Sequence, residues 1–298
     1  MINIKTSSFI WIIFYLLLTM IFVTFCADII GLRIAKYIWF KLFLLCLPVI
    51  LLLFHSFYTL SAARGIMFIV IASATGLIME ILGLKNGVIF GGHYIYQSNQ
   101  PTIASVPLSV VLFWAVFIYT GYCMVNSFLI WTNREKPNIK HNNYWLLPLL
   151  IVADGLIVVA IDLFMDPLEV YAGNWRWLEG GPYYGIPVGN FIGWFCVTAI
   201  ATAAYRSFEY FVPNKEPTYD KSVFVIPVLL YGILSLCFAM AAIKHQMLGL
   251  ALLGSILMMP TVIVNLLLFR KRAITLTNNL DKRPLCAMAG RPDLLRNS

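Results

Sequence analysis

Charged side chains are scarce in this 298-residue chain, because only 11% of its residues are Asp, Glu, Lys or Arg while 61% are hydrophobic. About a quarter of the residues of a soluble globular domain are charged, so this composition excludes a soluble fold. Apolar stretches long enough to cross roughly 30 Å of hydrocarbon as helices lie at 8–28, 37–60, 64–84, 105–131, 144–165, 187–208, 223–243 and 247–269. We therefore expect an all-α, polytopic membrane helix bundle of about eight transmembrane helices, formed by a single domain over 1–269.

The sequence also lacks the spacings that hold metals or disulfides. Its six cysteines, at positions 26, 46, 123, 196, 237 and 286, include no CxxC pair, and five of them lie in apolar runs. We interpret them as small buried hydrophobic residues. The four histidines, at positions 55, 93, 141 and 245, include no HxxxH spacing. The sequence therefore predicts no metal site.

The net charge of +8 is unevenly distributed along the chain. With eight helices both termini share one side, and 15 of the 21 Lys and Arg, including Arg206 and the seven that follow residue 269, fall on that side. The positive-inside rule then predicts a multi-pass protein of the cell membrane with both termini in the cytoplasm. We interpret residues 270–298 as a basic, disordered cytoplasmic tail that orients the chain, and not as a nucleic-acid-binding segment.

Two stretches of the chain resemble each other. Each has, in order, an acid within an apolar run, an aromatic pair, a proline and a tryptophan: Glu80, Tyr94, Tyr96, Pro107 and Trp114 in the first, and Asp162, Trp175, Trp177, Pro187 and Trp194 in the second. The proline and the tryptophan are seven residues apart in both. The pattern predicts an internal helix-cap-helix repeat with parallel halves that together build one site. The segments 85–105 and 166–186 are rich in Gly, Tyr, Trp and Pro and nearly free of Lys, which indicates caps that fold over a cavity.

Acidic residues at membrane depth are the strongest candidates for function. A carboxylate in a spanning helix is costly unless it is paired, hydrated or protonated. Asp162 and Asp166 are four residues apart and share a helix face, with Asp154 on roughly the same face. Two carboxylates this close repel each other, which favours one of them remaining a neutral acid. The alternatives are that Asp166, followed by Pro167, ends the helix, and that Glu80 and Asp162 make structural hydrogen bonds.

Aromatic residues surround these acids in the sequence. Trp175, Trp177 and their counterparts in the first half could belong to an interfacial aromatic belt. They could also line the acid site, where each aromatic face stabilises a desolvated cation by roughly 0.5–2 kcal/mol. An acid with an aromatic lining is what carbocation chemistry on an isoprenoid requires. Asn190 and Arg176 are the remaining polar candidates, and Arg176 could pair with Asp166 or Glu169 or extend to lipid headgroups.

Four motifs in the second half carry a resemblance to a known family: Asp166-Pro167, Trp175-Arg176-Trp177, Tyr184-Gly185-Ile186-Pro187 and Asn190-Phe191-Ile192-Gly193-Trp194. Over roughly 60–215 the chain resembles the membrane carotenoid-biosynthesis proteins that include carotenoid 1,2-hydratases and bisanhydrobacterioruberin hydratase. The resemblance implies that water is added across the terminal C1=C2 bond of an acyclic carotenoid without a cofactor. The implied partners are that lipophilic carotenoid, water, the lipid bilayer and other carotenoid-pathway enzymes.

The resemblance and the acid pattern together assign roles to individual residues. Asp162 and Asp166 would supply the proton, and Glu80 would orient or deprotonate the attacking water. The substrate-binding residues would be Tyr94, Tyr96, Trp175, Trp177, Tyr184, Asn190 and Trp194.

Three other functions share some of these features. Related lycopene-type end-group cyclases carry acids after the proline, whereas Val188, Gly189 and Asn190 follow Pro187 here, which favours hydration. An intramembrane prenyltransferase would use Asp162 and Asp166 as a DxxxD motif, but it needs a second aspartate-rich cluster that this chain lacks. A small-molecule or proton-coupled transporter also uses repeats and buried acids, although here the acids gather near one face.

Overall fold

A computed structural model describes residues 2–32, 37–97, 100–132, 145–212 and 221–281. Within these ranges eight helices are long and apolar enough to cross a membrane, so the prediction of a polytopic all-α bundle is confirmed. The helices are α1 (Ile2–Ile29), α2 (Ile38–Leu60), α3 (Ala62–Asn86), α4 (Leu108–Trp131), α5 (Leu146–Tyr171), α6 (Val188–Phe211), α7 (Val225–Lys244) and α8 (Leu248–Asp281), with a short 3₁₀ helix, η2 (Lys221–Phe224), before α7.

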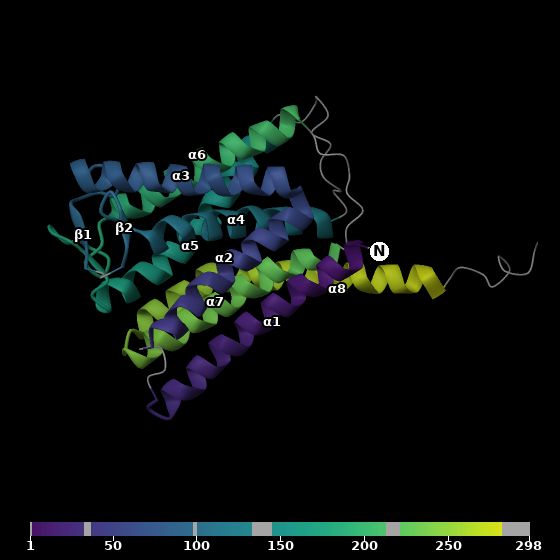
Figure 1. Cartoon of the computed structure of the whole chain (residues 1–298), viewed down its shortest axis with the longest axis horizontal. Coiled ribbons are helices and arrows are strands. Elements are labelled where there is room, and N and C mark those ends of the chain that lie inside the picture. The colour runs from purple at the N-terminus through teal and green to yellow at the C-terminus, as the bar shows by residue number, and fades with distance from the viewer. Residues whose placement is uncertain (1, 33–36, 98–99, 133–144, 213–220, 282–298) are drawn as a thin grey trace, which may run out of the picture.

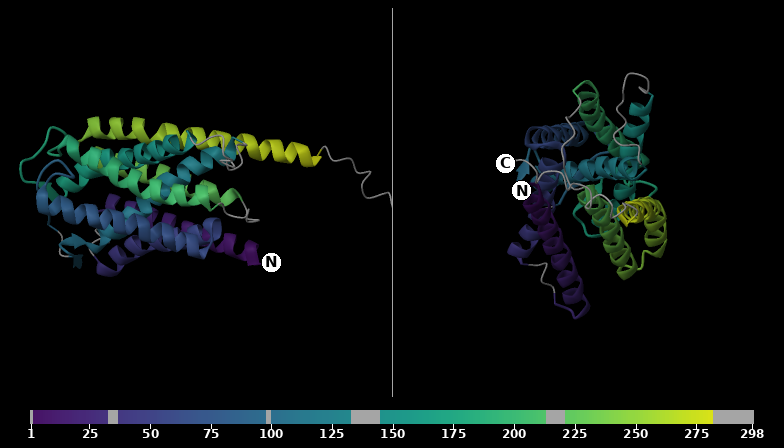
Figure 2. Two further views of the ribbon diagram at one scale, coloured as in Figure 1. Left: turned by 90° about the horizontal axis from the view of Figure 1, so that it is seen from above. Right: turned by 90° about the vertical axis from the view of Figure 1, so that its right-hand side faces the viewer.

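The helices run along one common direction and give the bundle two distinct ends (Figure 1). The segments that join α3 to α4 and α5 to α6 lie at one end, which we call the cap end. The first residues of α1 and the last residues of α8 lie at the opposite end, the terminal end, as expected for eight spans. Figure 2 shows the same arrangement from two further directions.

Helix α8 extends beyond the boundary that we expected between the membrane domain and a disordered tail. It continues past residue 269 to Asp281, because residues 270–281 contain no Gly or Pro that would end a helix. The loss of hydrophobicity at residue 270 marks the end of the span and not the end of the helix. The rest of the expected tail, 282–298, lies outside the described residues.

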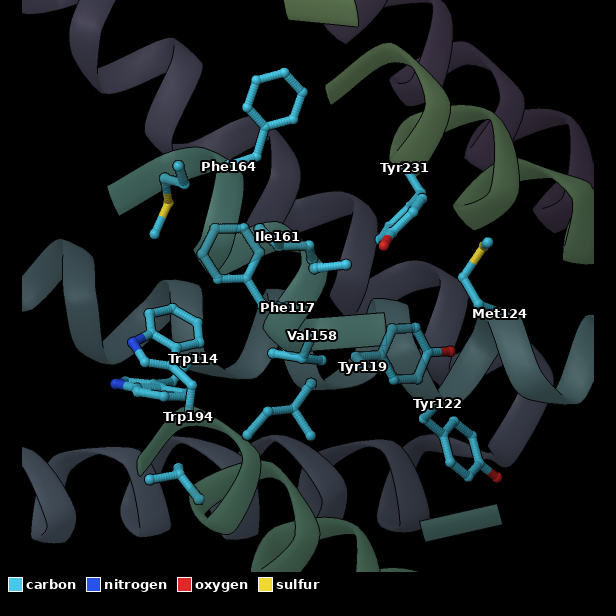
Figure 3. Close-up of a cluster of buried hydrophobic side chains, with 14 of the residues drawn as sticks. Trp114, Phe117, Tyr119, Tyr122, Met124, Val158, Ile161, Phe164, Trp194 and Tyr231 are labelled. Carbon is cyan, nitrogen blue, oxygen red and sulfur yellow. The ribbon is translucent and has the colours of Figure 1, made fainter. Parts of the chain in front are cut away.

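Helix α4 is the centre of the bundle, because it packs against α2, α3, α5, α6, α7 and α8. It is buried along most of its length, and its large side chains form the core cluster shown in Figure 3 with residues of α5 and α6. Gly121 brings α4 close to α5, since a Cβ at this position would lie 3.1 Å from the Asp154 carbonyl oxygen. Close approach at small residues is the usual way in which membrane helices pack.

The cap segments pair with each other as short strands. Strand β1 (Tyr94–Tyr96) from the first half and β4 (Trp175–Trp177) from the second form an antiparallel pair, and β2 (Thr102–Ile103) pairs with β3 (Val106–Pro107). Glycines allow the two halves to meet beside the first pair. A Cβ on Gly91, whose φ is +73°, would lie 2.7 Å from the Gly189 Cα, so no larger residue fits at this crossing.

Candidate active site

A cavity of about 520 Å³ lies toward the cap end of the bundle. Its walls come from both halves of the repeat and from α2 and α7. The polar side chains in the wall are Glu80, Gln100, Ser109, Asp166, Glu169, Asn174 and Asn190. The remaining lining residues are apolar or aromatic, and their only polar groups are the tyrosine hydroxyls and the tryptophan indole N–H groups. The two expected halves of the site therefore meet around one cavity.

Glu80 on α3 is held by three hydrogen-bond donors. Its Oε2 accepts hydrogen bonds from the hydroxyls of Tyr94 at 2.6 Å and Tyr96 at 2.7 Å, and its Oε1 accepts one from Nε1 of Trp114 at 3.1 Å. The side chain is 4% exposed. Three donors are the arrangement that stabilises an ionised carboxylate away from water. Gly76 makes room for Trp114, because a Cβ there would lie 2.3 Å from the Trp114 Cγ.

The hydroxyls of Tyr94 and Tyr96 remain donors to Glu80 over a wide pH range. Burial raises the pKa of both phenols, and the neighbouring Glu80 carboxylate raises it further. Each hydroxyl therefore keeps its proton well above the ordinary tyrosine pKa of about 10.

Asp162 and Asp166 on α5 share a single donor group. The Nδ2 of Asn190 on α6 lies 2.9 Å from Asp162 Oδ2 and 2.7 Å from Asp166 Oδ2, which sets an upper limit of about 5.6 Å on the distance between these two oxygens. Asp166 lines the cavity, and Asp162 lies behind it with 0% exposure. The second Asp162 oxygen, Oδ1, is buried and has no hydrogen-bond partner among the described residues.

Position 190 is set by the start of α6. Pro187 precedes the first helical residue, where a missing N–H costs nothing, and the backbone N–H of Asn190 donates to the Pro187 carbonyl at 3.0 Å. This start places Asn190 in the first turn of α6, facing the end of α5.

The aromatic pairs of the two halves face each other across the strands. The register places Tyr94 opposite Trp177 and Tyr96 opposite Trp175, so that these four side chains share one face of the pair. Ring centroids are 5.7 Å apart for Tyr94 and Trp177 and 5.9 Å apart for Tyr96 and Trp175. All four side chains line the cavity.

The two tryptophans that follow the prolines also meet. The rings of Trp114 on α4 and Trp194 on α6 have centroids 4.1 Å apart and planes inclined by 35°, as Figure 3 shows. Both line the cavity. Equivalent positions of the two halves are therefore neighbours in space, and they form one continuous aromatic wall around the acids.

Tyr184 and Arg176 lie away from this wall. Tyr184, which we predicted to bind substrate, is 43% exposed and does not line the cavity. The chain turns tightly between Tyr183 and Ile186, and the turn directs Tyr184 outward at a φ of +53°. Arg176 alternates with the two tryptophans of β4 and is exposed on the opposite face of the strand.

The neighbouring Tyr183 has a different environment. Its hydroxyl donates to the carbonyl of Leu163 on α5 at 2.9 Å. Burial, followed by the nearby Tyr184 and Asp162, raises its pKa to about 12. Tyr183 thus fastens the second cap to α5 and does not line the cavity.

Asp154 belongs to a second polar cluster toward the terminal end. Arg206 on α6 donates to both of its carboxylate oxygens, from Nε at 2.6 Å and from Nη2 at 2.7 Å. The guanidinium also donates to Asn126 at 3.2 Å and lies 4.6 Å from the ring centroid of Tyr122, whose hydroxyl donates to Glu209 at 2.8 Å. Arg206, which the sequence analysis counted only toward the charge of the predicted cytoplasmic side, is 5% exposed and ion-paired.

Four polar residues of the cavity wall were not candidates in the sequence analysis: Gln100, Ser109, Glu169 and Asn174. Glu169 follows Asp166 by three residues and so lies on nearly the same face of α5. Its Oε2 accepts a hydrogen bond of 2.5 Å from Nδ2 of Asn174. From the sequence we considered Glu169 only as a partner of Arg176. Its spacing of three residues from Asp166 was the clue that could have identified it as a residue of the cavity wall.

Comparison with known proteins identifies a protein family. The profile of a protein family described as "Carotenoid biosynthesis protein" matches residues 40–261. No curated protein and no solved structure matches the chain. The matched region includes both halves of the repeat and every residue that lines the cavity.

Proposed function

Because this chain belongs to the family of carotenoid biosynthesis proteins, we propose that it is a hydratase that adds water to the terminal C1=C2 bond of an acyclic carotenoid. One observation carries the proposal: Asp166, which Asn190 bridges to the buried Asp162, lines the same aromatic cavity as Glu80, which is held by three donors. The first arrangement suits a proton donor, and the second suits a carboxylate that stays ionised.

The aspartate pair would supply the proton. Two buried carboxylates that share one amide donor repel each other when both are ionised, so the pair is most stable with a single proton. No Lys or Arg lines the cavity within the part of the chain that the structure describes, which leaves the pair without a cation to offset two charges. Asp166 faces the cavity, and it would transfer its proton to C2 of the substrate. Both aspartates are then ionised, and the new carbocation offsets one of the two negative charges.

The aromatic wall would stabilise the cation that follows. Addition of the proton to C2 leaves a tertiary carbocation at C1, and the faces of Trp175, Trp177 and Trp194 are available in the same cavity. Each face contributes roughly 0.5–2 kcal/mol to a desolvated cation. Capture of the cation by water then depends on where a water molecule is held in the cavity.

Glu80 would hold that water. A carboxylate accepts about four hydrogen bonds, and Glu80 receives three, so that one position remains for a water molecule. The water oxygen forms the new bond to C1, and a water proton passes to the Glu80 carboxylate. Return of this proton to the aspartate pair restores the site, and the reaction consumes one water and no net proton.

A neutral hydrocarbon end group fits this cavity better than an isoprenoid diphosphate. A diphosphate requires Mg²⁺ or basic side chains, whereas the charged groups that line the cavity are the acids Glu80, Asp166 and Glu169. The lining therefore favours a substrate without charge at its reacting end.

Mass spectrometry of pigments tests the proposal directly. The chain is expressed in a host that makes lycopene, and the expected product has gained one water per reacted end. An isomer of unchanged mass would show that an internal alkene captures the cation, which is the cyclase reaction, and would overturn the proposal. Asp166→Asn serves as the matched control, because it keeps the size of the side chain and removes its acidic proton.

A further inference from the structure

Helices α2, α4 and α7 build an apolar side of the cavity that carries none of the acids. The side chains from these helices at this place are Leu44, Leu45, Val110, Phe113, Leu234 and Phe238. All six are partly exposed, and the cavity is not fully enclosed. Helices α2 and α7 lie outside the repeat, and their presence in the wall is not explained by the acid site.

Toward the terminal end, α1 fills the space between α2 and α7. There Ile10 and Phe14 of α1 are buried in a cluster with Leu51 of α2 and Ile226 of α7. Both α2 and α7 pack on α4, but they make little contact with each other. On the cap side of the filled region, the cavity reaches Leu44 on α2 and Leu234 on α7.

The cavity is too small for a whole carotenoid. A volume of 520 Å³ equals that of a sphere roughly 10 Å across, whereas an extended carotenoid is about as long as the hydrocarbon core is thick, roughly 30 Å. Most of the substrate must therefore lie outside the cavity. The polar side of the cavity, at Glu169 and Asn174, is unsuited to a hydrocarbon chain, because burying polar groups against it without partners is costly.

We propose that only the reacting end group enters the cavity and that the polyene chain leaves along α4 between α2 and α7 into the bilayer. This inference rests on the proposed function and adds to it the route that the polyene chain takes from the site to the lipid. The far end lies in lipid and contacts no part of the site, so substrates that differ only there are accepted alike.

Pigment binding tests the passage independently of turnover. The protein is purified from a carotenoid-producing host, and bound pigment per protein is measured by visible absorption. Leu234→Trp overfills the passage and is expected to reduce bound pigment about tenfold. Leu236→Trp is the matched control on the same helix, because Leu236 is 53% exposed and outside the cavity, and it is expected to bind as the unaltered protein does.

A second pair of variants, on α2, distinguishes a blocked passage from misfolding of the Leu234→Trp protein. Leu45→Trp on α2 is expected to behave as Leu234→Trp does, with Phe43→Trp as its control, because Phe43 is 58% exposed and does not line the cavity. Unchanged pigment binding in both passage variants would overturn the inference. So would finding that the unaltered protein binds no pigment, or that a phospholipid occupies the passage in its place.

Substrate length separates the passage from the reaction. A short isoprenoid with the same terminal trisubstituted alkene does not extend beyond the cavity, so Leu234→Trp is expected to slow its conversion several-fold less than the roughly tenfold loss expected on the full-length carotenoid. Equal loss on both substrates would overturn the passage. If the unaltered protein binds pigment and changes neither substrate, the hydratase proposal fails, while the loss of binding in the passage variants still supports the passage.

Discussion

Replacement of Asn190 by leucine tests the bridge between the two aspartates most directly. Leucine has nearly the shape of asparagine and donates no hydrogen bond. The variant therefore removes the contacts of 2.9 Å to Asp162 and 2.7 Å to Asp166 and leaves both buried carboxyl groups in place.

The size of the effect follows from the two lost hydrogen bonds. A hydrogen bond to a charged group contributes about 1.5–3 kcal/mol, and the unsatisfied Asp162 Oδ1 shows that no spare donor stands ready among the described residues. We expect the free energy of unfolding to fall by about 2–4 kcal/mol, because one carboxyl of the pair is neutral and its bond is weaker. If the bridge also positions the proton donor, turnover falls by about a hundredfold or more.

The assay compares turnover in membranes with thermal unfolding of the purified protein at matched abundance. Thr198→Val is the control, since Thr198 lies two turns further along α6, is fully buried, and has a hydroxyl oxygen without a partner in the described part of the chain. Removing that hydroxyl is expected to be neutral or slightly stabilising. The reasoning would be refuted if Asn190→Leu had a turnover rate within a factor of two of the Thr198→Val rate and the same free energy of unfolding as Thr198→Val.

Four further changes have distinct expected outcomes. Asp166→Asn should slow hydration by about 10²–10⁴-fold, the usual contribution of a general acid, at unchanged abundance; near-normal turnover would place the proton donor elsewhere. Trp175→Ala should slow it several-fold to about thirtyfold by the loss of one cation-stabilising face, with Trp175→Phe retaining most of the rate. Arg206→Met should cost about 3–5 kcal/mol of stability by leaving a buried charge unpaired, and adding Asp154→Leu should recover most of it; no recovery would contradict a purely structural pair. Because burial raises the pKa of Tyr96, its hydroxyl stays protonated, and the hydration rate should show no decline as the pH passes the ordinary tyrosine pKa of about 10. A decline at that pH in the unaltered protein that is absent in Tyr96→Phe would show that the Tyr96 hydroxyl loses its proton there.

The sequence by itself determined where the helices lie and most of the residues that form the site. A bilayer requires long apolar helices, so hydropathy alone located the eight spans of the described residues, with each boundary within six residues of where the structure has it. The same demand makes acids at membrane depth conspicuous, and the repeat of acid, aromatic pair and tryptophan indicated that two halves contribute to one cavity. These are local properties of the chain, which depend on residue type and spacing and not on neighbours in space.

The tertiary structure decided which polar groups meet. Asp154 and Asp162 are eight residues apart and share a helix face, yet Asp154 pairs with Arg206 while Asp162 shares Asn190 with Asp166. The outward direction of Tyr184 likewise depends on a tight turn, and the pairing of β1 with β4 joins segments about 80 residues apart in the sequence. Periodicity shows which residues of a helix share a face, but the neighbour that this face meets depends on the rotation and depth of each helix in the bundle, and these are set only when all the helices pack together.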